Sequence, residues 1–350
     1  MQENIDILNT YIDDGKCLLM IGPDIAFTQN NNPIHLDVKK FFEKEQNVEF
    51  DNDNFLTFKS NKDKTFFINK FKKFYDENSK SGDIHKKIAQ IPFNFIISVS
   101  PDVILKNTFD SLGIPCIYDF YDKKTNPKDI QNFSSEKPLI YNLFGCIKHE
   151  ESLILTYDDL FEFLFAILDD KKLPRSIKEA INNVKVFLFI GFDFEKWYMR
   201  LILKMLNLNK ELTMALENNF KSEPTKNFFI KNLEMELLPD DFNTVITQIY
   251  NDFSKKGKLR QVQELSENPV STKVKDFVKQ DDLEQALEML EDFLSGKDEM
   301  LSNQVTMIFG QLASLTKRTL KGIIGEADAK LERNVITDRI LTLANEIKNI

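Results

Sequence analysis

The sequence predicts an α/β fold, a Rossmann-like parallel sheet flanked by helices, followed by a small all-α C-terminal helical bundle. Up to about residue 255, short apolar runs alternate with segments of helical periodicity, which is the pattern of a mostly parallel sheet. From Val270 onward no strand signal is visible, and apolar residues recur at helical spacing. A chain of 350 residues is long enough for two domains. We expect an α/β domain at 1–258, a linker at 259–271 and a helical domain at 272–350.

The expected strands are short and apolar. Cys17–Ile21 (CLLMI) is apolar throughout, as a central strand buried on both faces should be, and a helix at Asn4–Gly15 precedes it. Leu139–Leu143 and Leu153–Thr156 are expected to form a pair of strands joined by a turn at Gly145. The other strands are expected at Phe93–Ser98, Ile114–Tyr118, Val186–Ile190 and Leu233–Leu238.

Helices are expected between these strands, and loops where the sequence is polar and irregular. The helices are expected at Pro101–Ser111, Tyr157–Leu168, Pro174–Asn183, Phe194–Leu206 and Asp240–Phe253. The loops are expected at Gln29–Asn32, Asn47–Asn54 and Asp122–Ser135.

The C-terminal region has the pattern of a compact four-helix module. Leu283, Leu287, Leu290 and the apolar face of Met300–Leu320 exceed what so small a bundle can bury by itself, which predicts contact with a like module. The four helices are expected at Lys273–Val278, Leu283–Leu294, Met300–Leu320 and Ala327–Ile347.

Composition excludes several classes of function. The net charge of −9 argues against a broad nucleic-acid-binding face. The N-terminus is acidic and amphipathic, unlike a signal peptide, and the longest apolar runs are too short to span a bilayer. The 3 cysteines have no close pairing and the 3 histidines no metal-ligand spacing. We expect a cytoplasmic protein with no metal site, no membrane association and no direct nucleic-acid partner.

Four segments follow expected strands and carry turn residues. They are IGPDIA (Ile21–Ala26), SVSPD (Ser98–Asp102), NLFGC (Asn142–Cys146) and GFDFE (Gly191–Glu195). In open α/β sheets a ligand binds at the carboxyl ends of the strands, so these four segments are expected to converge on one crevice.

In this order the four segments resemble the sirtuin-like NAD-consuming family, particularly its prokaryotic anti-phage branch. The family's motifs at these places are GAG, a TTNYD-like segment, LHG and GxS, and the resemblance covers roughly residues 1–255. It implies NAD or a related nucleotide as the candidate ligand, although the residues themselves establish no cofactor. The positions that it assigns to cofactor binding are Gly22, Pro23, Asp24, Ala26, Ser98, Ser100, Asp102, Asn142, Gly145, Gly191, Phe192 and Asp193.

The departures from these motifs bear on catalysis. The family's catalytic histidine aligns with Phe144, which cannot move a proton, and its asparagine aligns with Ser100. Asp24 replaces the second glycine of GAG and Asp193 the serine of GxS. Each carboxylate near the expected diphosphate position would repel it, at a cost of roughly 1–2 kcal/mol in a partly wet pocket. The catalytic residues are therefore unknown.

Substitutes for the missing base are few. His149 would need a register shift to reach the pocket and is otherwise a surface histidine on a hairpin. Cys146 has no neighbouring base and is typical of a small core residue. Asp102 is either a catalytic candidate or an acid at a helix N-terminus, where the helix dipole stabilises it. Asp158 and Asp159 have the positions of acids at the start of the next helix.

The C-terminal region resembles the effector-associated adaptor domains of bacterial conflict systems. The resemblance is carried by Lys317–Ile336, a helix that ends at Gly322 and Gly325 and is followed by an acidic start and an LERN-type helix. It implies self-association and partners that carry a similar helical adaptor domain. A generic helical dimerisation domain is the alternative.

Two functions therefore compete. The first is a catalytically silent sirtuin-like module of an anti-phage or conflict system that senses a ligand or acts as a scaffold. The second is an active NAD hydrolase, an NAD glycohydrolase that depletes cellular NAD on assembly. Phe144 and Ser100 favour the first. A protein deacylase is disfavoured because it relies on the missing histidine, and because the zinc-binding cysteines of such enzymes are absent.

Overall fold

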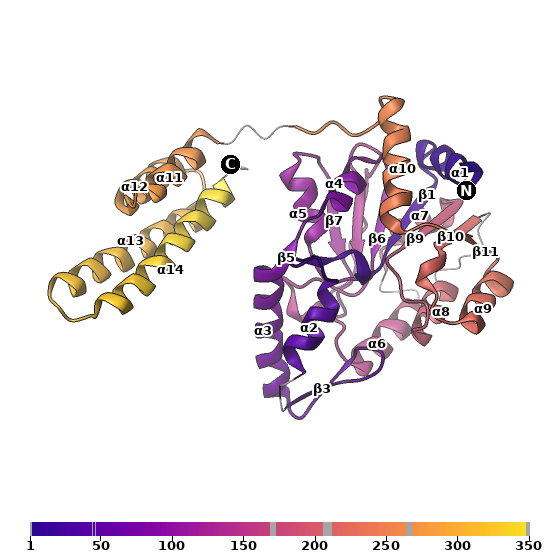
Figure 1. The fold of residues 1–350 in the computed structure, drawn as a ribbon, viewed down its shortest axis with the longest axis horizontal. Helices are drawn as coiled ribbons and strands as arrows, with labels where there is room; N and C mark the ends of the chain where they lie inside the picture. Colours follow the sequence, from indigo (N-terminus) through magenta and orange to yellow (C-terminus); the bar gives the residue numbers. More distant parts are fainter. Residues whose placement is uncertain are drawn as a thin grey trace. The chain divides into compact units, whose positions relative to one another are not determined.

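The computed structural model describes residues 2–43, 45, 47–168, 173–205, 212–263 and 268–347. The chain divides into two compact units, Met1–Gln263 and Glu264–Ile350, and each is described by itself (Figure 1). The first is an α/β unit and the second a helical unit, so the predicted fold class is confirmed.

The α/β unit is built on a seven-stranded sheet in which every neighbouring pair is parallel. The order is β11-β10-β9-β1-β6-β8-β7. Because β6 and β9 lie on opposite sides of β1, the strand order switches there, which is where ligands bind in such sheets. The strands are β1 (Cys17–Ile21), β6 (Phe95–Ser98), β7 (Ile117–Phe120), β8 (Leu139–Asn142), β9 (Val186–Ile190), β10 (Leu212–Leu216) and β11 (Met235–Leu238).

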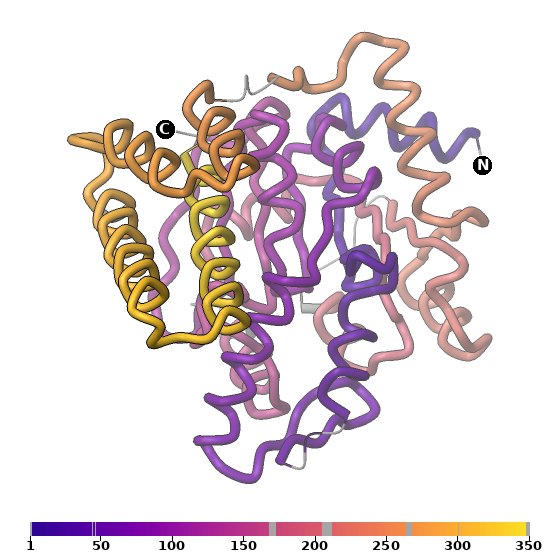
Figure 2. Tube along the Cα trace, turned by 60° about the vertical axis from the view of Figure 1, so that its left-hand side comes forward, coloured from indigo at the N-terminus to yellow at the C-terminus, as the bar shows by residue number. Residues whose placement is uncertain are grey.

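Helices cover both faces of the sheet (Figures 1 and 2). Side chains of β1 alternate between two apolar clusters, with Leu18 and Met20 in one and Leu19 and Ile21 in the other. This burial on both faces explains why CLLMI has no polar position. The helices of one cluster are α1 (Gln2–Asp13), α4 (Asp83–Gln90), α5 (Ile104–Ser111) and α10 (Phe242–Lys255). Those of the other are α6 (Tyr157–Leu168), α7 (Arg175–Asn183), α8 (Trp197–Met205) and α9 (Glu223–Leu233).

A long insertion lies between β1 and β6. Figures 1 and 2 both show it at the lower end of the unit, away from α10. Its core is rich in aromatic rings, for example Phe42, Phe67 and Phe71, and includes Leu153 and Leu155 from beyond β8. Its elements are β2 (Phe27–Thr28), α2 (Ile34–Phe42), β3 (Val48–Phe50), β4 (Leu56–Phe58), α3 (Asn61–Asn78) and β5 (Ser79–Lys80).

Two local expectations were wrong. Leu153–Thr156 is not a strand paired with β8, because β8 is hydrogen-bonded to β6 on one side and β7 on the other and has no free edge. A single turn of 3-10 helix at Glu150–Ser152 follows Gly145 instead, and the Leu155 carbonyl accepts a hydrogen bond from the Leu56 amide at 2.8 Å. The stretch expected to be a loop at Asn47–Asn54 contains β3, which pairs with β4.

The helical unit contains four helices in its described part, close to the predicted positions. They are α11 (Pro269–Lys279), α12 (Leu283–Leu294), α13 (Glu299–Leu320) and α14 (Glu326–Glu346). The sequence predicts that Leu283, Leu287, Leu290 and the apolar face of Met300–Leu320 cannot all be buried within the bundle. Met307 and Leu320 of α13 are 66% and 84% exposed, whereas Leu283, Leu287 and Leu290 are buried. All three leucines lie in the core of the bundle, because α13 and α14 are long enough to cover them with residues such as Val305 and Ile340.

The predicted linker at 259–271 begins with a residue anchored in the α/β unit. Arg260 is buried, and its guanidinium donates hydrogen bonds to the carbonyls of Ala89, Ile91, Phe93 and Ser135. Residues 264–267 of that linker lie outside the described part of the chain, and α11 begins at Pro269.

Candidate functional site

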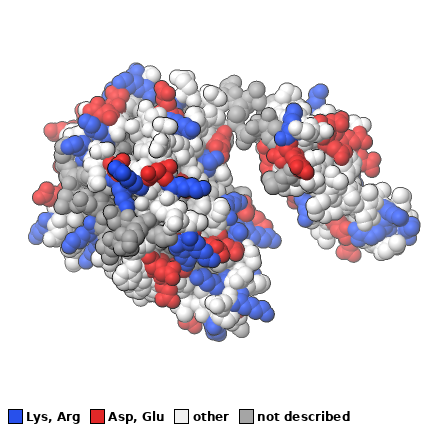
Figure 3. All heavy atoms as spheres, turned by 180° about the vertical axis from the view of Figure 1, so that it is seen from behind, with Lys and Arg blue, Asp and Glu red and all other residues white. Residues whose placement is uncertain are grey.

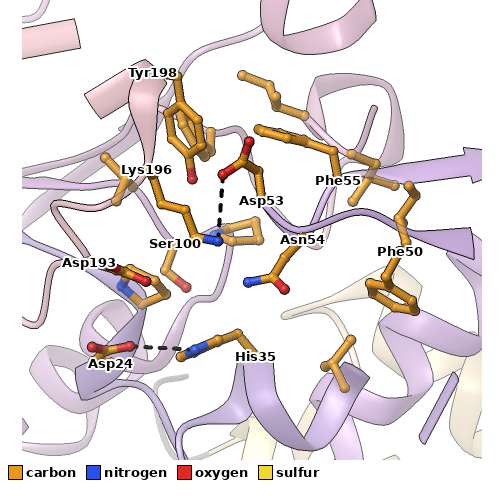
Figure 4. Close-up of a pocket in the computed structure, with 18 of the residues that line it drawn as sticks. Asp24, His35, Phe50, Asp53, Asn54, Phe55, Ser100, Asp193, Lys196 and Tyr198 are labelled. Carbon is orange, nitrogen blue, oxygen red and sulfur yellow. Dashed lines mark ion pairs between the residues drawn. The ribbon is translucent and has the colours of Figure 1, made fainter. Parts of the chain in front are cut away.

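The loops that follow β1, β6, β8 and β9 converge on one cavity of about 170 Å³ (Figure 4). In a parallel sheet these loops share one edge, and the predicted convergence is confirmed. Each loop contributes to the lining, through Asp24, Ser100, Phe144 and Asp193 respectively.

The insertion forms the opposite wall of the cavity. The turn of the β3–β4 hairpin contributes Asp53, Asn54 and Phe55, and α2 contributes His35. The aromatic part of this wall consists of Phe50, Phe55, Phe67, Phe71 and Tyr75. Both walls of the cavity therefore combine apolar rings with a few polar side chains, as small-molecule sites commonly do.

Phe144 occupies the position of the missing base and is packed as an apolar residue. It is buried, its ring meets Phe163 edge-on at 5.5 Å between centroids, and Tyr198 lies 6.1 Å away. No proton can be accepted at this position.

An imidazole and a carboxyl group meet in the cavity at a place that the sequence did not indicate. His35 Nε2 lies 3.5 Å from Asp24 Oδ1 (Figure 4). Burial lowers the pKa of His35, and the nearby Asp24 opposes this only in part. Burial also raises the pKa of Asp24; His35 opposes that rise and Asp193 adds to it. The pair is thus held in an environment that disfavours both of its charged forms.

A second pair of opposite charges lines the same cavity. Lys196 Nζ lies 3.6 Å from Asp53 Oδ1, and the Tyr157 hydroxyl donates a hydrogen bond to Asp53 Oδ2 at 3.0 Å. Asp193 is paired with Lys221 at 2.8 Å, and its other oxygen accepts from the Glu195 amide. Among the described lining residues, three carboxyl groups therefore face one lysine.

The backbone amides of the first loop are already engaged. The Gly22 amide donates to the Ile190 carbonyl at 2.8 Å, and the Asp24 amide donates to the Gly191 carbonyl at 3.1 Å. The Ala26 amide donates to the carbonyl of Pro23, a residue that has no amide hydrogen. A Cβ at residue 22 would lie 2.0 Å from the Gly191 oxygen, so glycine is required there by backbone packing. This loop differs from phosphate-binding loops, whose amides point at the ligand.

The helix after β6 is also capped from within the chain. Asp102 Oδ1 accepts from the Ile104 amide at 2.9 Å, at the start of α5, and the Ser100 hydroxyl donates to Asp102 Oδ2. Asp102 therefore acts as the helix N-terminal acid that the sequence offered as one alternative. Its carboxylate occupies the place where a helix N-terminus would attract an anion.

The predicted cofactor-binding positions are distributed over two hollows. Pro23, Asp24, Ser100, Phe192 and Asp193 line the main cavity. Gly22, Ala26, Ser98, Asp102 and Asn142 line a separate hollow of only about 20 Å³.

Two of the predicted glycines line neither hollow, and each has a packing role. Gly145 has φ +83°, and a Cβ there would lie 2.1 Å from the Ser152 oxygen. Gly191 has φ +67°, and a Cβ there would lie 2.7 Å from Ile25. Both glycines are thus required by the backbone itself.

The weak catalytic candidates lie elsewhere. His149 is exposed, rests against the ring of Phe120 at 4.8 Å, and is not among the lining residues. Cys146 is buried, with its amide bonded to the Ser152 hydroxyl. Asp159 is buried at the start of α6, paired with Lys64 and Lys123.

The sequence missed His35, Asp53, Asn54, Lys196 and Tyr198. The first three belong to the insertion, and nothing in their spacing relates them to the strand ends. Lys196 and Tyr198 directly follow the segment GFDFE, so a longer fourth segment would have included them. Within the described residues there is no group of three metal-ligating side chains, and no helix is long and apolar enough to cross a membrane.

Two family models match the chain. The model described as SIR2-like domain matches residues 94–229, and that described as effector-associated domain 11 matches residues 271–348. The chain therefore carries a SIR2-like domain followed by an effector-associated domain, as both resemblances predicted. The first match begins at β6, so Asp24, His35 and Asp53 lie outside it, whereas Ser100, Phe144 and Lys196 lie within it.

The chain is also similar to a solved structure described as "Structural Basis for the Mechanism and Regulation of Sir2 Enzymes". The identity is 9% and the TM-score 0.39, over 73% of this chain and 99% of that chain. No curated protein matches the sequence.

Proposed function

We propose that this chain is a cytoplasmic component of a bacterial anti-phage or conflict system whose SIR2-like domain does not hydrolyse NAD by itself. It acts as a ligand-sensing or scaffolding part and is assembled through its effector-associated domain. One observation carries the proposal: the position of the family's catalytic base is a phenyl ring packed edge-on against Phe163. General-base catalysis supplies on the order of 10²–10⁴ in rate, and Phe144 supplies none of it.

The polar groups of the cavity support the same conclusion. A diphosphate would face Asp24, Asp53 and Asp193, with Lys196 as the only lysine among the described lining residues and already paired. Three amides of the first loop donate to the chain's own carbonyls, and the Ile104 amide at the start of α5 donates to Asp102. These amides are therefore not available to hold a phosphate.

The helical unit supports assembly, because not all of its apolar side chains are buried. Its core is closed, but five large apolar side chains of α13, α14 and the turn between them are 52–84% exposed. They are Met307, Leu320, Ile323, Leu331 and Val335. Such exposure marks interaction surfaces, so we expect homo-oligomers and complexes with proteins that carry a similar domain.

The distribution of charged side chains does not support a nucleic-acid partner. On the face shown in Figure 3, acidic and basic side chains are interspersed over the α/β unit. With a net charge of −9, we propose neither a nucleic-acid nor a membrane partner.

The second candidate function is an active NAD hydrolase, and His35 is the observation that favours it. Burial lowers the pKa of this imidazole, so at neutral pH it is an uncharged group able to accept a proton inside the cavity. It stands on the insertion rather than at the family's position, and it is paired with Asp24.

Nicotinamide release from NAD by the purified full chain separates the two functions. The proposal predicts a rate equal to that of buffer for the wild type and for His35→Gln alike. Rapid release by the wild type that is lost in His35→Gln, but kept in the exposed control His149→Gln, would establish the hydrolase.

A further inference from the structure

We infer that the cavity binds a small aromatic cation that lacks phosphate. The inference rests on the proposed function only in taking the cavity as a ligand site, and it names the chemical class of that ligand.

The size and the walls of the cavity favour a single ring system. Its volume of about 170 Å³ is below the roughly 300–1,000 Å³ typical of sites for drug-sized molecules. The rings of Phe50, Phe55 and Phe71 line it on the side of the insertion, and Phe144 and Phe192 on the side of the sheet. Aromatic walls facing one another at this scale suit a flat ring, which gains from stacked or edge-on contacts.

The charges at the polar end of the cavity favour a cation. Lys196 is held by Asp53 and also donates to the Asn52 carbonyl, and Lys221 is held by Asp193. Among the described residues, Asp24 is paired with the His35 imidazole and with no lysine or arginine. It is therefore the carboxyl group of the site that a cationic ligand would compensate most.

The same arrangement disfavours anions. Asp193 and its partner Lys221 both act electrostatically on Asp24, in opposite directions. An anion at this end would therefore meet two carboxyl groups, and the lysine beside them is already paired. A cation at this end would instead be attracted to Asp24, the carboxyl group there that is not paired with a lysine. Ring stacking and charge thus point to the same class of ligand.

Three isosteric probes test the inference with the full chain. Benzamidine, benzamide and benzoate share one ring and nearly one shape, but carry charges of about +1, 0 and −1 at neutral pH. Titration calorimetry should give the lowest Kd for benzamidine and the highest for benzoate, with at least a tenfold difference between these two. Asp24→Asn should remove most of the preference for benzamidine over benzamide.

The matched control is Asp14→Asn, an exposed aspartate just before β1, at the opposite edge of the sheet from the cavity. This variant should show the same order of the three Kd values, and the same ratios between them, as the wild type. Binding of benzoate as tight as that of benzamidine would overturn the inference, and so would the absence of saturable binding of all three probes at millimolar concentration. Because both results come from the wild type, they stand even if Asp24→Asn does not fold. Neither depends on whether the chain releases nicotinamide from NAD.

Discussion

His35 and Asp24 form a pair of titratable side chains whose charged forms are disfavoured by their position in the cavity. His35 Nε2 lies 3.5 Å from Asp24 Oδ1 in a cavity that opposes the charge of either group. A half-buried titratable pair of this kind costs stability in at least one range of pH, and groups with perturbed pKa values cluster at functional sites. His85 is buried as well, but its Nδ1 accepts the Gly82 amide at the start of α4, which gives it a structural role.

The pH dependence of stability should reveal the lowered pKa of His35 in the folded protein. A histidine whose pKa is lower when folded takes up its proton more readily on unfolding, so stability falls as pH drops through the unfolded pKa of about 6.5. We predict that the free energy of unfolding decreases from about pH 7.5 to about pH 5.5 and that His35→Gln reduces this slope. Burial also lowers the pKa of His85, which is present in both proteins, so part of the slope remains. A slope unchanged by His35→Gln, or reduced equally by the exposed control His149→Gln, would contradict the prediction.

The fluorescence of Trp197 gives the measurement. It is the chain's single tryptophan and lies at the start of α8, so it reports on the α/β unit alone. This matters because a chain of two units need not unfold in one step.

Arg260 is a second residue with a measurable role. Its guanidinium donates to four carbonyls around the end of α4, β6 and the loop before β8, and none of the carboxylates in the described part of the chain pairs with it. We predict that Arg260→Met lowers the free energy of unfolding of the α/β unit by about 2–4 kcal/mol, because buried carbonyls lose charged donors. Lys258→Met, which removes an exposed ion pair with Asp13, should cost less than about 1 kcal/mol. Equal effects of the two changes would contradict this role.

At the scale of elements, apolar runs and helical periodicity predicted most of the sheet and the helical bundle. Periodicity could not tell that β8 is an interior strand, because the pairing of β6 and β7 with it is not local in sequence. For the same reason β10 was not predicted. The insertion was not predicted either, and its hairpin turn brings Asp53 close to strand ends that are far away in the sequence. The loops of the sheet edge were predictable because parallel strands must share that edge. The wall of the cavity that the insertion forms opposite these loops was not predictable.

The exposed residues of α13 and α14 give the element-level test. We predict that the full chain self-associates and that Leu331→Glu with Val335→Glu shifts it toward the monomer by at least tenfold in dissociation constant, because charges in an apolar contact must be desolvated. Light scattering with size exclusion measures this, and Glu291→Lys on the exposed face of α12 is the control. A wild type that stays monomeric at high concentration would refute the proposed assembly.

At the scale of the whole molecule, each unit has one chemically distinctive surface. In the α/β unit it is a cavity at the switch point of the sheet, with carboxyl groups at one end and aromatic rings along its walls. In the helical unit it is the apolar surface of α13 and α14. We propose that the first recognises a ligand and the second a partner, and that neither performs the family's reaction on NAD.

The claim that the α/β unit does not hydrolyse NAD is tested most directly by an assay of nicotinamide release from NAD. The assay compares the wild type with the double change Phe144→His with Ser100→Asn. The double change restores the two side chains of the family's motifs, but it leaves Asp24, Asp193 and the engaged amides of the first loop in place. We predict no release above buffer from either protein and no calorimetric signal for NAD. Rapid release by the wild type would contradict the account, and release by the double variant alone would show that the cavity does accept the diphosphate.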